Sequence, residues 1–262
     1  MDPEIALSSP LWAMAAAILL VAGITQGALG FGFPAIATPL LVLITDVKTA
    51  IILNLLPNFT VNVISTFTGG NWSASLGRYW PVAAWVLAGS WLGATFIIHA
   101  PQEPVRILLA LAIFAYLLQH KLTHVDWNWL ARRPRLSAAA FGLTGGFFSG
   151  SVNNSLPPLL IYFTLLGLET TAMTQILNLC FLGGKVVQGA TLGFAGEISL
   201  FAVIANVPLT VVGLVGMWIG TRLQQRISPA SYSRLLRRGL FIIALLLLWQ
   251  EVRHFCADKI AQ

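Results

Sequence analysis

Long uncharged blocks of apolar residues alternate with short polar connections along nearly the whole chain. No Asp, Glu, Lys, Arg or His occurs between Ile5 and Thr45. Further uncharged blocks follow at 49–77, 79–98, 136–168 and 198–221. A helix needs about 20 mostly apolar residues to cross a bilayer. The pattern therefore predicts an all-α polytopic membrane protein.

Two of these apolar blocks contain residues that interrupt helices. They read "GFGFPAIATPLL" at 30–41 and "GSVNNSLPPLLIYF" at 150–163. Non-helical backbone at membrane depth is tolerated only where it is buried in protein or lines a cavity. We therefore expect two broken or re-entrant helices whose breaks meet near the membrane midplane. Gly30 and Gly32 would let the backbone approach a ligand closely.

Short matches recur in the same order in the two halves of the chain. "GITQGALGFGFPAIATPLL" begins at Gly23 and "GFFSGSVNNSLPPLLIYF" begins at Gly146; "ILNL" then occurs at 52–55 and 176–179, and "GSWLG" at 89–93 corresponds to "GMWIG" at 216–220. The matches predict a first transmembrane repeat at 1–120, a basic loop at 121–135 and a second repeat at 136–262. The expected segments are 11–30, 34–45, 47–68, 79–99 and 103–120 in the first repeat, and 136–150, 157–167, 170–192, 198–224 and 229–255 in the second.

Composition and charge give this membrane protein an orientation. Of the residues, 57% are hydrophobic and 9% are charged, against about 25% charged in soluble domains. Basic residues gather in the central loop and between the last two segments, at Lys121, Arg132, Arg133, Arg135, Arg222, Arg226, Arg234, Arg237 and Arg238. Both stretches should be cytoplasmic, with both termini periplasmic. The two halves then have inverted topology, which is typical of secondary transporters, and the net charge of +6 does not indicate nucleic acid.

The residues around the two breaks suit an anion. Pro34 and Pro157 fit the first turns of the short helices, whose starts offer free N–H groups and a positive dipole end. The polar residues nearby are Gln26, Ser151, Asn153, Asn154 and Ser155. An oxyanion needs several such donors. The alternative is that these side chains only cap the broken helix ends or bond between helices.

Lys185 is a charged residue well inside a predicted span. A charge at that depth costs about 2.5–3.5 kcal/mol on insertion scales, and the nearest acids, Glu169 and Glu197, fall at the two ends of the segment. Lys185 could be the counter-charge for an anionic substrate. Alternatively, it reaches an interface or pairs with a carboxylate of another helix.

Polar residues also form stripes on the two matching segments that contain "ILNL". Asn54, Asn58 and Asn62 recur every four residues, and Asn178, Lys185 and Gln188 share one side of the equivalent segment. Both stripes could line a pathway or form interhelical hydrogen bonds. The predicted substrate-binding residues are Gln26, Gly30, Gly32, Asn54, Ser151, Asn153, Asn154, Ser155, Asn178, Lys185 and Gln188.

Other chemistry has little support in the sequence. No Ser/His/Asp or Cys/His constellation lies at membrane depth, and the chain has no Walker A motif, so we expect no enzyme activity and no cofactor. His120 and His124, close to Asp126, have an i, i+4 spacing that could hold a metal. They lie in the basic cytoplasmic loop, where a surface role is favoured, so no metal site is predicted. Cys180 and Cys256 lie far apart and suggest no disulfide.

The two broken segments end in "PLL" and "PPLLI". With the paired segments and the basic central loop, they resemble the sulfite exporter TauE/SafE family (TSUP, DUF81). The resemblance covers about 11–250. Its glycine-rich stretch corresponds to Gly23, Gly27, Gly30, Gly32, Pro34 and Pro39, and its second copy to Gly146, Gly150, Pro157 and Pro158. The second copy departs from the family's glycine run at 152–155. The resemblance implies a secondary transporter of a small sulfur oxyanion in the bacterial inner membrane, with lipids and the anion as its partners. A sulfite exporter is the first expectation; the alternatives are transport of thiosulfate or sulfoacetate, and a passive anion channel.

Overall fold

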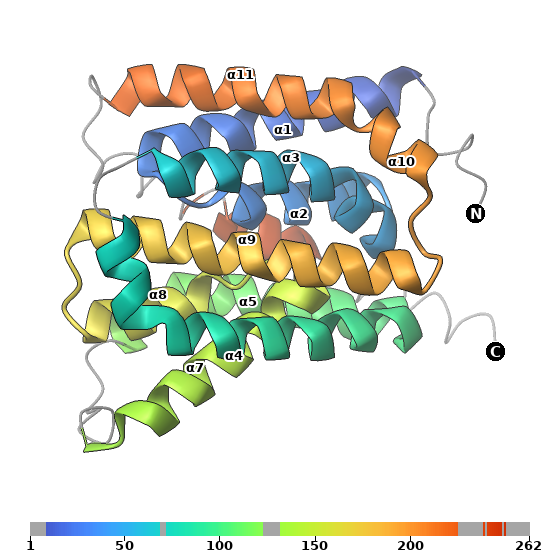
Figure 1. Ribbon diagram of the computed structural model, residues 1–262. Helices are drawn as coiled ribbons and strands as arrows, with labels where there is room; N and C mark the ends of the chain where they lie inside the picture. Colours follow the sequence, from blue (N-terminus) through green and yellow to red (C-terminus); the bar gives the residue numbers. More distant parts are fainter. Residues whose placement is uncertain are drawn as a thin grey trace.

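A computed structural model describes residues 9–68, 72–122 and 132–224, together with 238, 240–247 and 249. These residues form helices and connections, and no strand occurs among them. The first half contains α1 (Ser9–Leu29), α2 (Phe33–Ile44), α3 (Val47–Phe67), α4 (Trp72–His99) and α5 (Gln102–Leu122); the second contains α7 (Pro134–Val152), α8 (Leu156–Leu165), α9 (Thr170–Phe194), α10 (Leu200–Ala205) and α11 (Val207–Gln224) (Figure 1).

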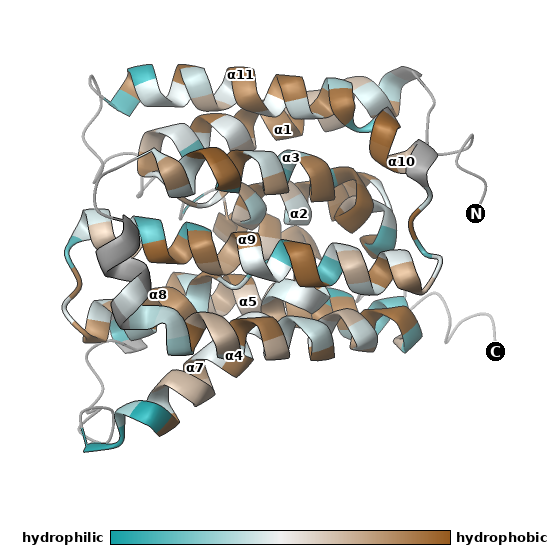
Figure 2. Cartoon of the chain, in the orientation of Figure 1, coloured by the Kyte–Doolittle hydropathy of each residue, from teal (hydrophilic) through white to brown (hydrophobic). Residues whose placement is uncertain are grey.

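Six stretches of the described chain are long and apolar enough to cross a membrane. They are Pro10–Leu29, Val47–Phe67, Tyr79–His99, Gln102–Gln119, Thr170–Phe194 and Ala202–Gln224. Hydrophobic residues dominate these helices, while hydrophilic ones gather at the start of α7 (Figure 2). The helices α2 and α8 are apolar but short. The prediction of an all-α polytopic membrane protein with two interrupted segments is confirmed.

The observed helices differ from the predicted segments at two places. The segment expected at 198–224 is divided at Asn206 into α10 and α11. Pro208 follows closely; it lacks the N–H group that would donate to the carbonyl oxygen of Ile204 in a continuous helix, and its ring would clash with that carbonyl. The side chain of Asn206 donates to the carbonyl oxygen of Ile52 at 2.9 Å. In α4, by contrast, Pro81 lies within a helix that begins at Trp72, earlier than predicted.

Parts of two predicted segments lie outside the described residues. Most of the loop at 121–135 and the start of the segment at 229–255 belong to these parts, and so do Arg226, Arg234 and Arg237. Residues 240–247 are helical, as that segment requires.

Glycine faces join helices from opposite halves of the chain. Helix α1 packs along α11, and α4 packs along α7. A Cβ atom added to any of eight glycines would come within 2.3 Å of a backbone carbonyl oxygen on the facing helix. These glycines are Gly23 and Gly27 on α1, Gly216 and Gly220 on α11, Gly89 and Gly93 on α4, and Gly146 and Gly150 on α7. Each pair has the GxxxG spacing that lets membrane helices approach closely.

Helices that the predicted repeat would pair with each other run in opposite directions. In Figure 1, α3 runs from right to left and its counterpart α9 from left to right; α1 and α7, and α4 and α11, are opposed in the same way. Helices α3 and α9 also contact each other directly. These directions are the ones that inverted repeats require.

The two ends of the bundle differ in charge. At the end where α3 and α11 finish and α7 and α9 begin, Arg133, Arg135 and Arg222 flank the helices (Figure 1); we call it the basic end. At the opposite end, Lys48 at the start of α3 forms an ion pair of 3.3 Å with Glu197 after α9. This ion pair links the two halves of the chain.

The glycine contacts yield a prediction for stability. We expect Gly146→Ala to lower the melting temperature of the purified protein, because its methyl group would meet the backbone of Val86 and force α4 and α7 apart. Such overpacking costs about 1–3 kcal/mol. The control is Gly193→Ala on α9, where no atom lies within 4 Å of the added carbon. Thermal unfolding in detergent compares the two variants, and equal melting temperatures would contradict the packing argument.

Candidate functional site

The first break is closed by two amide side chains. Gly30 and Gly32 have φ angles of 79° and 109°, which favour glycine, and they separate α1 from α2. The Nε2 atom of Gln26 lies 2.9 Å from Ser65 Oγ, 2.9 Å from Asn178 Oδ1 and 3.2 Å from the Gly30 carbonyl oxygen. Asn178 donates to the same carbonyl at 2.8 Å. We call Gln26, Gly30, Ser65 and Asn178 the Gln26 cluster.

The second break holds the buried lysine. Asn153, with a φ of 59°, ends α7. The ammonium group of Lys185 donates to Asn153 Oδ1 and, at 2.6 Å, to Gln188 Oε1. Gln188 in turn donates to the carbonyl oxygen of Gly150 at 2.7 Å. We call Lys185, Asn153, Gln188 and Gly150 the Lys185 cluster.

Lys185 is a buried charge without an acidic partner among the described residues. Its side chain is 2% exposed, and both of its hydrogen-bond acceptors are neutral amide oxygens. Amide oxygens stabilise an ammonium group only in part, since they carry no net charge. A bound anion would supply the missing negative charge.

The two clusters lie along one helix. Asn178 and Lys185 are seven residues apart on α9, which corresponds to about 10 Å at 1.5 Å per residue. Helix α9 therefore connects the two breaks.

The other predicted site residues belong to neither cluster and bond to an adjacent helix or within their own helix. Asn54 donates to Thr38 on α2 at 2.8 Å. The hydroxyl of Ser151 donates to the Phe147 carbonyl of its own helix at 2.6 Å. Asn154 and Ser155 are buried in the break, and the backbone N–H of Asn154 donates to Phe148 at 3.1 Å. For Ser151 the contact is therefore within its own helix.

The two short helices offer an anion different numbers of donors. In α8, the residues after Leu156 are Pro157 and Pro158, and neither carries an N–H group. In α2, the backbone N–H of Phe33 donates to Gln26 Oε1 at 3.1 Å. The expected free N–H groups are thus reduced at both helix starts, so side chains become the main donors.

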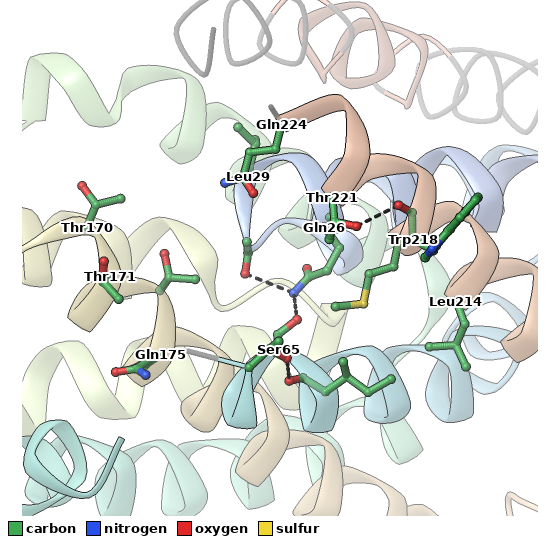
Figure 3. A pocket seen from close by; sticks show the side chains of 16 residues that line it. Gln26, Leu29, Ser65, Thr170, Thr171, Gln175, Leu214, Trp218, Thr221 and Gln224 are labelled. Atoms are coloured by element: carbon green, nitrogen blue, oxygen red, sulfur yellow. Dashed lines mark hydrogen bonds between the residues drawn. The ribbon is translucent and has the colours of Figure 1, made fainter. Parts of the chain in front are cut away.

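A cavity of about 590 Å³ leads from the basic end to the Gln26 cluster. Gln26 and Ser65, both buried, form its floor, while exposed Thr170, Thr171 and Gln224 stand at its mouth (Figure 3). We call this cavity the vestibule. Arg222 lies over the ring of Trp218, a wall residue, with its guanidinium carbon 5.0 Å from the ring centre. A positive charge therefore lies beside the vestibule.

Ser65 was not among the predicted site residues, although it belongs to the Gln26 cluster. A signal for it exists in the sequence: it follows Asn62 by three residues and so continues the polar stripe of α3. The vestibule threonines carry no comparable signal, because they come from segments far apart in the chain.

Of the comparisons with known proteins, the one with family models finds a match. No curated protein and no solved structure matches the chain. A model of the family described as "Sulfite exporter TauE/SafE" matches residues 15–248, which is most of the chain. The protein therefore belongs to the sulfite exporter TauE/SafE family of membrane transporters.

Proposed function

We propose that this protein is a secondary transporter that exports a small sulfur oxyanion, sulfite first of all, across the bacterial inner membrane. Family membership supports transport of such an anion. The observation that carries the proposal is Lys185: a buried ammonium group, held at the second break inside a predicted span, with only amide oxygens as described partners. Charged residues inside membrane proteins commonly mark substrate or ion pathways.

Each cluster has a role in this proposal. Lys185 supplies the positive charge, and its charge-assisted hydrogen bonds are stronger than those between neutral groups. Asn153 and Gln188 hold the ammonium group in place when no substrate is bound. The Gln26 cluster receives the anion from the vestibule, while Gly32, Asn54, Ser151, Asn154 and Ser155 complete the surroundings of the two breaks.

The shape of the bundle supports alternating access. The vestibule opens at the basic end, which the distribution of Lys and Arg assigns to the cytoplasm. The opposite end carries the Lys48–Glu197 ion pair between the halves. This arrangement suits a carrier in the state that collects its substrate from the cytoplasm. We propose that residues 1–120 and 136–262 are inverted repeats that rock around the site, with both termini in the periplasm.

A larger organosulfur anion is the second candidate. One wall of the vestibule is apolar and includes Leu214, Met217 and Trp218, whereas the facing wall carries hydroxyl groups. A sulfonate with a short organic part, such as sulfoacetate, would contact both walls.

Replacement of Lys185 tests the counter-charge. We expect Lys185→Met, which keeps an unbranched side chain, to weaken sulfite binding and efflux by about tenfold to a hundredfold, since hydrogen bonds to charged groups contribute about 1.5–3 kcal/mol. Efflux is measured from sulfite-loaded proteoliposomes. Lys121→Met, at the exposed end of α5, is the control and should change affinity by no more than about threefold. Normal affinity and efflux in Lys185→Met would contradict the role of Lys185 as a counter-charge.

Ligand binding should also raise the stability of the wild-type protein. A ligand present at about 100 times its Kd adds about 2.7 kcal/mol, on the order of 5–10 °C in melting temperature for a chain of this size. We expect sulfite to give such a shift and Lys185→Met to lose it. Thiosulfate, sulfate and sulfoacetate are tested in parallel, and a larger shift with sulfoacetate would favour the second candidate. Flux through proteoliposomes that never saturates would indicate a channel instead.

A further inference from the structure

The polar stripe of α3 is buried without being fully paired. Asn54, Asn58 and Asn62 are each 0% exposed. Asn62 donates to Asn58 at 2.7 Å, and Asn54 donates to Thr38. Three polar atoms nevertheless have no hydrogen-bond partner: Asn54 Oδ1, Asn58 Nδ2 and Asn62 Oδ1. Interhelical hydrogen bonding therefore accounts for only part of this stripe, and a buried polar atom without a partner requires another explanation.

The stripe begins at the vestibule. Ser65, one helical turn beyond Asn62, forms part of the vestibule floor and contacts Gln26 at 2.9 Å. Asn54 precedes Ser65 by eleven positions on α3, about 16 Å at 1.5 Å per residue. It therefore extends from the vestibule toward the opposite end of the bundle.

The register between α3 and α9 brings the stripe level with the buried lysine. Ser65 and Asn178 both bond to Gln26 Nε2. A Cβ on Gly189 would lie 3.5 Å from the end of Leu55. Because the two helices run in opposite directions (Figure 1), this register places Asn58 at the height of Lys185. Asn153, the partner of Lys185, also has an unpaired amide nitrogen.

The other side of α3 is apolar at the same height. Leu55, Leu56 and Phe59 line a mostly apolar groove of about 390 Å³ between α3 and α9, whose lining also includes Lys185. Phe59 is 37% exposed, whereas its neighbour Asn58 is 0% exposed. Adjacent residues of one helix thus provide a polar inner surface and an apolar outer one.

We infer that the buried amide face of α3, formed by Asn54, Asn58 and Asn62, is wetted, that the anion passes along it from the vestibule past Asn62 to Lys185, and that Asn58 is a direct ligand of the anion there. Asn54 continues the wetted face one turn beyond Lys185. The role as anion path rests on the proposed function. Water donates to the unpaired oxygens of Asn54 and Asn62. The unpaired Nδ2 groups of Asn58 and Asn153 donate to the anion beside Lys185, so binding satisfies atoms that otherwise lack partners.

Cysteine labelling at two neighbouring positions tests whether this face is wet. Asn58→Cys and Phe59→Cys are made in a chain carrying Cys180→Ala and Cys256→Ala. The purified proteins are reconstituted and treated with a negatively charged, membrane-impermeant methanethiosulfonate. We expect Asn58→Cys to react at least about tenfold faster, because only a thiol in contact with water forms the reactive thiolate. Equal rates, or faster reaction at position 59, would overturn the path.

Transport by matched leucine variants tests the ligand role. Asn58→Leu removes the amide at nearly constant size, and we expect sulfite efflux to fall about tenfold or more. Phe59→Leu, at the same height on the apolar side, should stay within about twofold of wild type. Unchanged efflux in Asn58→Leu would overturn the role of Asn58. Absence of sulfite transport in the wild type would reject the proposed function instead, and the labelling contrast would still decide whether the face is wet.

Discussion

The architecture depends on direct backbone contact between helices of opposite halves. Lipid tails are as apolar as leucine side chains, so helices in a bilayer gain little by burying apolar groups and associate through close packing. In this protein the four GxxxG pairs provide that packing, and they bring α1 against α11 and α4 against α7. The long helices therefore hold the two halves as one body, and the short helices α2 and α8 are left to carry the breaks.

The breaks show how such a frame accommodates irregular backbone in the membrane. Each interruption exposes main-chain groups that lipid cannot satisfy, and amides from α1 and α9 bond to them: Gln26 and Asn178 at the first break, and Gln188 at the second. The same helix α9 carries Lys185 between these amides. The amides that bond to the interrupted backbone and the ammonium group that suits an anion therefore lie next to each other. This explains why the polar residues of the chain concentrate on so few helices.

Much of the fold could be predicted from the sequence because membrane helices are specified locally. Uncharged runs of sufficient length indicated α1, α3, α4, α5 and α9 within a few residues, apart from the early start of α4, and Gly and Pro marked the limits of α2 and α8. The division at Asn206 was missed, since Pro81 and Pro208 are both prolines near the start of a long apolar segment and only tertiary contacts distinguish them.

Less of the candidate site could be predicted from the sequence. Residue types singled out Gln26, Asn178, Lys185 and Gln188, but their pairing into two clusters depends on the register of α3, α7 and α9. A local pattern does not determine that register. The same limit explains why the place of Ser65 in the Gln26 cluster was not foreseen. The backbone bond of Ser151 agrees with the alternative that the polar residues at the break satisfy the helix end.

The pairing of α1 with α11 has a consequence for biosynthesis. These helices are separated by most of the chain, with α1 ending at Leu29 and α11 beginning at Val207. At about 5–20 residues per second, a ribosome needs roughly ten seconds or more to produce the intervening segments. During that interval the glycine face of α1 lies in the membrane without its permanent neighbour. The nascent chain must therefore be protected by lipid, by a provisional helix contact or by the insertion machinery until its last long helices arrive.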